Sequence, residues 1–334
     1  MTNEKTALVL GAAGGVGFET AKALVHHGWR VKALVRDMTR APQLAGAEWV
    51  HGDAMDRDDV IAAARGASVI VHAVNPPGYK NWPKLVVPMV MNTIAAAELN
   101  GARIVLPGTV YNFGPDAFPN LREDDAQNPR TRKGKIRVSM ERALEQATSR
   151  GVKTLILRGG DFFGSRGNSS WFTQAMVRAN APLKSVTYPG KRDVGHAWAY
   201  LPDFAETIAQ LLARESDLAL FERFHFGGHY FARGVEFAER TREAAGAPKA
   251  AINGFPWAPV LALSPFVPLF REMAEMRYLW QRDVRLDNAK LVRFLNAEPH
   301  TPIDTALRAT LSALRVCGPR KQPIVAECAA SSAT

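Results

Sequence analysis

Three glycines near the amino end, Gly11, Gly14 and Gly17, have the spacing of a phosphate-binding turn. The first permits a tight bend, the second lets the main chain approach a pyrophosphate, and the third allows a helix to lie close on a sheet. A helix that starts at such a turn offers unpaired N–H groups and its positive dipole end to phosphate. The alternative is that the glycines serve only the turn. We expect dinucleotide contacts from Gly11, Ala13, Gly14, Gly15, Val16 and Gly17.

The stretches on either side of this turn can position it. Residues 6–10 form a short apolar run of the kind that is buried in a parallel sheet. Residues 15–27 carry apolar side chains at helical spacing, and residues 31–35 read as a second buried strand. Strand, glycine turn, helix and strand together predict a βαβ unit, which is the context that a dinucleotide site requires.

The residue after the second strand discriminates between dinucleotides. An acidic residue there binds the ribose 2′-hydroxyl of NAD, but this chain has Arg36. Because a guanidinium suits a 2′-phosphate, we predict NADP, with Arg36 as its main clamp and Arg40 as a helper. Two alternatives remain open. Asp37 can reach the ribose of NAD after a small backbone shift, and Arg36 can be a solvated surface charge.

The glycine spacing, Arg36 and the later Gly52-Asp53 together resemble the short-chain dehydrogenase/reductase superfamily, in its extended and atypical branches of NAD(P)-dependent epimerase/dehydratase-like proteins. The resemblance covers about the first 165 residues well. It implies an α/β fold, a Rossmann doubly wound parallel sheet with a smaller C-terminal substrate lobe. It also implies that Asp53 and Ala54 contact the adenine. The competing interpretation is that Asp53 or Asp56 caps a helix over residues 58–64.

The next two strands end at the same edge of the expected sheet. Residues 68–73 form the fourth strand, so that Ala73 faces the cofactor, and His72 within this apolar run reads as a satisfied core histidine. The fifth strand, 103–106, leads to two hydroxyl residues, Thr109 and Tyr111, beside the expected nicotinamide. Both are candidates for hydrogen-bonding the reacting oxygen.

The family resemblance implies a serine or threonine at this point, and it also implies a Tyr-x-x-x-Lys pair on the next helix. Thr109 is the nearest match to the hydroxyl residue, although the local alignment can place Pro107 there. When the expected helix is aligned with the Tyr-x-x-x-Lys pair, Lys133 takes the place of the tyrosine and Arg137 takes the place of the lysine. We expect Arg137 to hold the ribose hydroxyls. Lys133 is a candidate acid or base if burial or Lys135 and Arg137 depress its pKa, and the alternative is a solvated basic helix face.

The domain organisation follows from this pattern. We expect residues 1–165 to form the NADP-binding domain, and residues 190–228 to return to it. Residues 166–189 and 229–317 are expected to form the substrate lobe, and residues 318–334 a flexible tail. In the lobe, His196, Trp198 and Tyr200 alternate, so one aromatic face either lines the substrate pocket or packs as core. The apolar window 255–270 contains four prolines, which argues against a membrane span and for a buried or pocket-covering segment, with a membrane-surface contact as the minor alternative.

Composition restricts the class of protein. The chain has 334 residues, 47% of them hydrophobic, which is typical of a globular protein. The net charge of +10 is scattered and accompanies no recognised nucleic-acid module, so we expect no nucleic-acid partner. Two cysteines, Cys317 and Cys328, give no disulfide framework and no cysteine metal site, and no metal is expected. The short polar start leads straight into the first strand, which argues against a signal peptide and fits a cytoplasmic location.

Two functions remain in view. The first is an NADP-dependent oxidoreductase or epimerase that transfers a hydride to or from a small-molecule substrate with a carbonyl or hydroxyl group. The second is a non-catalytic NADP-sensing regulatory protein, which the missing tyrosine favours. By analogy with relatives, we also expect a homodimer through the helices 83–100 and 133–150.

Overall fold

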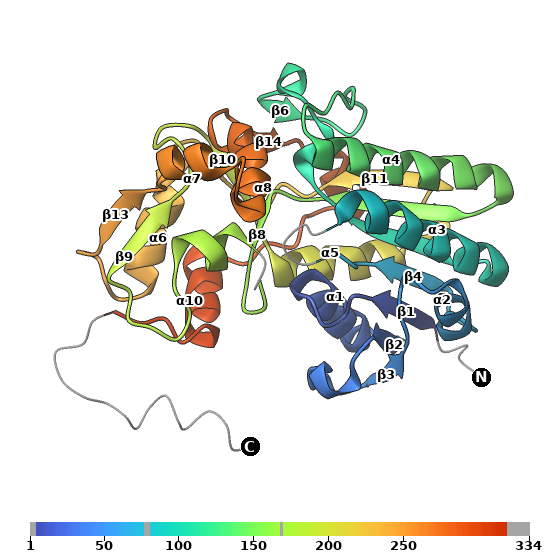
Figure 1. Cartoon of the computed structure of the whole chain (residues 1–334). Helices are drawn as coiled ribbons and strands as arrows, with labels where there is room; N and C mark the ends of the chain where they lie inside the picture. Colours follow the sequence, from blue (N-terminus) through green and yellow to red (C-terminus); the bar gives the residue numbers. More distant parts are fainter. Residues whose placement is uncertain (1–4, 77–80, 168–169, 319–334) are drawn as a thin grey trace.

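The computed structural model describes residues 5–76, 81–167 and 170–318 (Figure 1). Its centre is a seven-stranded sheet in the order β11-β7-β5-β4-β1-β2-β3, and every neighbouring pair is parallel. Short apolar runs form the inner strands because both faces of a parallel sheet are covered, whereas the edge strands β3 and β11 contain charged residues. The strands are β1 (Thr6–Leu10), β2 (Arg30–Val35), β3 (Ala47–His51), β4 (Val69–His72), β5 (Arg103–Gly108), β7 (Lys153–Arg158) and β11 (Phe221–His225).

Helices cover both faces of the sheet. Helices α1 (Gly15–His26) and α5 (Leu201–Ala213) pack on the face to which Val9 points, and α2 (Arg57–Ala63), α3 (Trp82–Asn100) and α4 (Arg132–Ala147) pack on the face of Leu10. The alternation of side chains along each strand separates the two buried clusters. The expected doubly wound α/β fold is therefore confirmed.

The strand order reverses between β1 and β4. From β1 the chain proceeds outward to β2 and β3, and it then returns to form β4 on the other side of β1. The register pairs Leu10 with His72, and the amide of Ala73 donates to the carbonyl of Leu10 at 3.0 Å. The crevice outside the carboxyl ends of strands at such a reversal is where open α/β sheets bind ligands.

A second part lies to the left of the sheet in Figure 1. A three-stranded sheet in the order β12-β10-β8 and a two-stranded sheet of β9 and β13 form its framework, and β14 pairs with β6. The strands are β6 (Asn120–Leu121), β8 (Asp161–Phe163), β9 (Ser185–Tyr188), β10 (His196–Tyr200), β12 (His229–Phe231), β13 (Ala251–Gly254) and β14 (Arg285–Leu286). The helices are α6 (Val235–Ala244), α7 (Trp257–Leu263), α8 (Pro268–Met276) and α10 (Ile303–Ala313), whereas α9 (Ala289–Leu295) packs on the central sheet beside β11.

Aromatic side chains fill the core of this lobe. Strand β10 is formed as expected, but all five of its residues are buried, including the alanines between the aromatic residues. Trp198 stacks on Phe237 with ring centroids 4.0 Å apart, and Phe163 packs against both rings. Core packing is thus the role of the alternating aromatic face, because strands of the lobe and helix α6 cover it.

The apolar window 255–270 differs from its expectation. It forms α7 and the start of α8, and prolines begin or interrupt these helices as expected. However, Leu263 and Leu269 are exposed, and Phe266 at the connection is 81% exposed. This hairpin tip projects outward, so the window is not buried as a whole, and its alternative role of covering a pocket stays a prediction. Across residues 5–76, 81–167 and 170–318, no helix combines the length and the apolar character that crossing a membrane demands.

Candidate functional site

Steric contacts explain two of the three glycines in the first turn. Gly11 has φ +84°, and a Cβ there would lie 2.6 Å from the carbonyl oxygen of Ala73. A Cβ on Gly17 would lie 2.3 Å from the carbonyl oxygen of Gly11. The turn is closed by the amide of Gly14, which donates to Gly11 at 2.9 Å. Gly11 and Gly17 are therefore required for the fold of the β1–α1 connection.

Gly14 has a different environment. A Cβ at this position would meet only the carbonyl oxygen of Gly11, at 3.4 Å, which is an ordinary contact. Gly14 is the N-cap of α1, and its first turn has no acidic residue; within residues 5–76, 81–167 and 170–318, no side chain caps this helix. Ala13 and Gly14 are exposed, while Gly15 and Val16 are half-buried. An exposed turn before an uncapped helix fits the pyrophosphate of a dinucleotide.

A basic residue that the sequence did not single out lies beside this helix start. A Cβ on Gly15 would lie 2.6 Å from the carbonyl oxygen of Arg166, so the segment after β8 runs close to the first turn of α1. The guanidinium of Arg166 lies over the ring of Phe18, 3.8 Å from its centroid. No local pattern could have indicated Arg166, because β8 and α1 are far apart in the sequence.

Three charged residues follow β2, namely Arg36, Asp37 and Arg40, and two of them form an ion pair with each other. Asp37 accepts hydrogen bonds from the amide and hydroxyl of Thr39, at 3.0 and 2.6 Å, and these bonds lower the pKa of its carboxyl. Arg40 pairs with the same carboxylate at 3.3 Å. Arg36 is exposed, and no ion pair joins it to another residue of the described ranges. Arg36 therefore has no charged partner within the described ranges, and the side chain of Arg40 is 84% exposed in spite of its pair with Asp37.

Two aspartates, Asp53 and Asp56, lie in the turn after β3, and only one of them caps the following helix. Asp56 is the N-cap of α2 and accepts from the amides of Asp58 and Asp59, at 2.9 and 3.1 Å. Asp53 instead accepts from the amide of Met55 at 3.0 Å. The buried Ala54 is held through its carbonyl oxygen, which accepts from an α3 side-chain amide. Capping α2 is therefore the role of Asp56 and not of Asp53.

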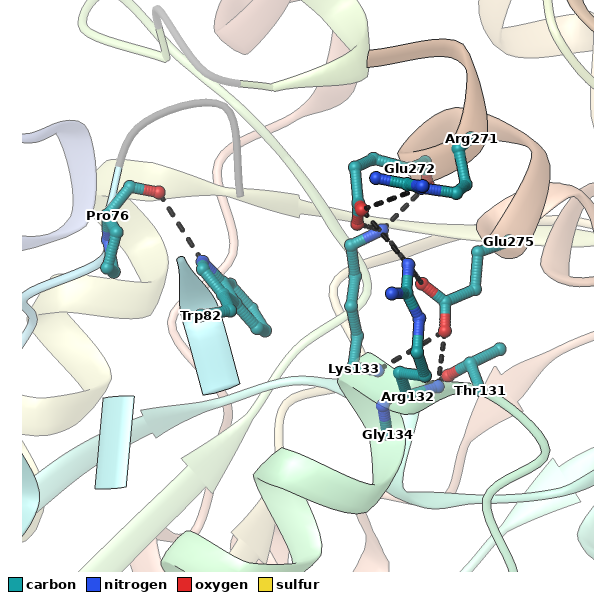
Figure 2. Close-up of polar contacts among 9 residues, drawn as sticks. All are labelled: Pro76, Trp82, Thr131, Arg132, Lys133, Gly134, Arg271, Glu272 and Glu275. Carbon is teal, nitrogen blue, oxygen red and sulfur yellow. Dashed lines mark hydrogen bonds and ion pairs between the residues drawn. The ribbon is translucent and has the colours of Figure 1, made fainter. Parts of the chain in front are cut away.

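His72 at the end of β4 is a satisfied core histidine, as expected. It is buried, and its Nδ1 lies 2.8 Å from the hydroxyl oxygen of Thr93 in α3. Burial, assisted by the charge of Arg137, lowers the pKa of His72 to about 3. The guanidinium of Arg137 lies 5.2 Å from the ring centroid of Trp82, whose indole N–H donates to the carbonyl of Pro76 at 3.4 Å (Figure 2). Arg137 thus stands close to the carboxyl end of β4.

The two hydroxyl candidates lie at the carboxyl end of β5. Thr109 precedes a short 3₁₀ turn, Val110–Asn112, and its hydroxyl oxygen accepts from the amide of Tyr111 at 3.4 Å. Both residues are half-buried. A Cβ on Gly134 would lie 2.3 Å from the carbonyl oxygen of Tyr111, so helix α4 starts directly against this turn.

Lys133 is held by the lobe. Its side chain is 2% exposed, and its Nζ lies 2.6 Å from Glu272 Oε2 and 3.3 Å from Glu275 Oε2. The same Nζ donates to the carbonyl of Glu272 at 2.7 Å. Glu275 also accepts from the backbone amides of Arg132 and Lys133, and therefore caps α4 from another element (Figure 2).

This arrangement changes the interpretation of Lys133. A solvated helix face is wrong for this side chain, because α8 buries it. Its immediate charged partners are two carboxylates rather than Lys135 or Arg137. Glu272 and Glu275 were not expected from the sequence, since nothing near residue 272 indicates that its partner is residue 133.

A buried ion pair fixes the middle of α4. Arg158 at the end of β7 donates to both carboxylate oxygens of Glu141, at 3.1 and 2.5 Å. His225 of β11 lies 3.1 Å from the same guanidinium, and burial with this charge lowers the pKa of His225 to about 3. The network joins α4, β7 and β11 and thereby sets the position of Arg137, one turn before Glu141.

The sequence of this chain matches the model of a known protein family. The model of the NAD-dependent epimerase/dehydratase family matches residues 7–225, which include the glycine turn, both hydroxyl residues and the Arg158 network. The chain belongs to this family. Its resemblance to the extended short-chain dehydrogenases is thereby confirmed.

Individual relatives agree with this assignment. A Streptomyces protein named 3-diazoavenalumate denitrifying reductase is 31% identical over 175 residues, covering 47% of this chain and 56% of that protein, so the match spans about half of the relative. MoeE5, solved in complex with UDP-glucose and NAD, has a TM-score of 0.72 at 17% identity, covering 93% of this chain and 98% of MoeE5. UDP-N-acetylglucosamine 4-epimerase from Bacillus cereus has a TM-score of 0.68 at 15% identity, and the match covers 96% of this chain and 99% of the epimerase. These two structures share the fold.

Proposed function

We propose that this member of the epimerase/dehydratase family is an NADP(H)-dependent reductase of a small carbonyl compound, in which Tyr111 replaces the usual tyrosine of the α4 helix as proton donor. The observation that carries the proposal is the position of Lys133. Its amine is buried in a cluster with Glu272 and Glu275, while the hydroxyl groups of Thr109 and Tyr111 belong to the turn that follows β5.

The residues of the crevice fit NADP(H). The main chain of the glycine turn and the N-terminus of α1 would bind the pyrophosphate, because Gly14, the N-cap residue, has no side chain with which to cap that helix. Arg36 would bind the 2′-phosphate, since Asp37 is engaged by Thr39. Asp53, Ala54 and Ala73 would lie along the adenine and ribose, and Arg137 would hold the nicotinamide ribose. When bound, NADPH supplies the hydride.

The chain supplies the proton and the alignment. Tyr111 would donate its hydroxyl proton to the carbonyl oxygen of the substrate as negative charge develops there. Thr109 would offer a second hydrogen bond to the same oxygen. Lys133 would stabilise the start of α4 and would exchange no proton with the substrate. Within this proposal, residues 1–165 with 190–228 form the cofactor-binding part, and 166–189 with 229–317 form the substrate lobe, except that strands β8 and β10 pair with β12 in the sheet of the lobe.

A reductase is favoured over an epimerase by the name of the Streptomyces relative, which is described as a reductase. The proposal is tested by NADPH oxidation at 340 nm against a panel of aldehydes, ketones and sugar nucleotides. We expect turnover of at least one carbonyl compound and slower turnover with NADH. Tight NADPH binding without turnover of any compound would contradict the reductase and favour a sensor.

Two substitutions separate the candidate proton donors. Tyr111→Phe should lower kcat about 100-fold, which is typical for loss of a general acid, and leave NADPH binding intact. Lys133→Met should lower stability, and the rate per folded molecule should fall less than threefold. A normal rate in Tyr111→Phe would exclude Tyr111 as the donor.

A further inference from the structure

We propose that the substrate is a planar aromatic carbonyl compound, whose ring lies against Trp171, Phe255 and Trp257. This inference rests on the proposed reductase function, because it concerns the substrate of the same site. It goes beyond that function by naming the chemical class that the lobe recognises and the side chains that select it.

Trp171 is the centre of an aromatic group in the lobe. Its ring centroid lies 5.8 Å from that of Phe255, 6.0 Å from that of Trp257 and 5.4 Å from that of Trp280. Interplanar angles of 80°, 50° and 71° describe edge-to-face and tilted contacts, and the guanidinium of Arg277 lies 5.7 Å from the ring centroid of Trp257.

Exposure distinguishes these rings from the core aromatic residues. Trp171, Phe255 and Trp257 are each half-buried, whereas Trp198 and Trp280 are buried. The indole N–H of Trp257 is already used, because it donates to the carbonyl of Pro189 at 2.7 Å. These rings therefore present partly open apolar surface.

The same tryptophan connects this group with the candidate proton donor. Trp171 packs against the core cluster of the lobe and also against a second cluster, which contains Val110, Phe113, Ala197, Met276 and Leu279. Tyr111 is packed against that second cluster as well. The aromatic surface and the Tyr111 side chain thus adjoin one small buried cluster between the sheet and the lobe.

The backbone after Trp171 provides an independent indication. Phe172–Met176 forms a π-helix, for which Trp171 is the N-cap residue. π-helical turns are rare and occur frequently at functional sites, because an extra residue in the turn changes the direction of neighbouring side chains.

The chemistry of the surface discriminates between substrate classes. A nucleotide sugar presents hydroxyl groups and a diphosphate, for which a site needs polar and cationic partners. A planar aryl group needs apolar contact and aromatic edges, which Trp171, Phe255 and Trp257 supply. In the reaction, the hydride of NADPH would add to the carbonyl carbon, and the π pair of the C=O bond would take the Tyr111 proton. The products are an alcohol and NADP⁺, and solvent restores the tyrosine proton.

The test compares two aldehydes of similar size, benzaldehyde and cyclohexanecarbaldehyde, with UDP-glucose as a third ligand. Their dissociation constants are measured by calorimetry in the presence of NADP⁺, and KM values by NADPH oxidation. We expect benzaldehyde to bind about tenfold more tightly than its saturated analogue, and UDP-glucose to bind more weakly than benzaldehyde. Equal binding of the two aldehydes, or preferential binding of UDP-glucose, would overturn the aromatic assignment.

Variants assign the effect to the proposed surface. Trp171→Leu should weaken benzaldehyde binding about tenfold, Trp171→Phe should restore most of it, and the NADPH dissociation constant should not change. Trp49→Leu, at a half-buried tryptophan of β3, is the matched control and should leave both values unchanged. If Trp171→Leu does not fold, Phe255→Leu replaces it. Unchanged benzaldehyde affinity in the folded variant would contradict the aromatic assignment. If the natural chain does not bind NADPH at all, the reductase function itself is contradicted.

Discussion

At the scale of single residues, the glycines of the first turn have separable roles. Gly17 is enclosed by the main chain of Gly11, whereas the space next to Gly14 is open. A methyl group at position 17 must therefore displace backbone, but one at position 14 would lie in the space that we assign to the pyrophosphate. Folding and binding can thus be tested at two positions three residues apart.

We predict that Gly14→Ala lowers the free energy of unfolding by about 1 kcal/mol or less, the scale of a changed N-cap, and weakens NADPH binding at least about tenfold. Gly17→Ala should instead cost several kcal/mol, because its Cβ would overlap the carbonyl of Gly11. Urea denaturation and calorimetry measure the two effects. A Gly14→Ala protein with full affinity would show that phosphate does not approach this residue.

His72 predicts a dependence of stability on pH. Its pKa is about 3 in the folded protein and about 6.5 when unfolded, so the unfolded state binds more protons between these values. The stability that neutral His72 contributes to the folded protein is therefore fully present above about pH 6.5, and it is lost as the pH falls towards 3. From pH 7.5 to 5 the loss is about 2 kcal/mol.

The measurement is urea denaturation of the natural chain and of His72→Leu at both pH values. The variant should lose about 2 kcal/mol less than the natural chain over this interval. Thr93 keeps a partner in the variant, because its hydroxyl also donates to the carbonyl of Met89 at 3.1 Å. Equal losses in both proteins would show that His72 is not buried in its neutral form.

At the scale of elements, the contact between α4 and α8 attaches the lobe to the sheet. Removing one partner of a buried ion pair leaves the other uncompensated and typically costs about 3 kcal/mol. We predict a loss of this size for Lys133→Met, with a smaller loss for Glu272→Gln because Glu275 still pairs with the lysine. The double variant should be more stable than the sum of the single effects implies. Additive losses in a double-mutant cycle would contradict direct coupling.

The elements themselves were largely predictable, because local pattern determines them. The apolar runs of β1, β3 and β7 and the proline at the start of α5 gave bounds within a few residues. The two-residue pairing of β14 with β6 was missed, because so short a strand carries no periodic signal. The glycine turn of the candidate site was visible for the same local reason. The partners of Lys133 were not, because tertiary packing alone brings α8 to α4.

At the scale of the whole molecule, the crevice between the β1 and β4 ends combines an open glycine turn with a lobe of aromatic side chains. The turn provides main-chain N–H groups for phosphate, and Arg36 stands at the end of the neighbouring strand β2. The lobe contributes the carboxylates that hold Lys133 and the rings that we assign to the substrate. The central claim is that this crevice binds NADP(H) through the turn and Arg36.

Calorimetric titration of the natural chain and of Arg36→Ala with NADPH and NADH tests this claim most directly. We predict that NADPH binds at least about tenfold more tightly than NADH to the natural chain, because a guanidinium pairs with the 2′-phosphate. The preference should largely disappear in Arg36→Ala, while NADH binding remains. Tighter binding of NADH, or no heat with either coenzyme, would contradict the account.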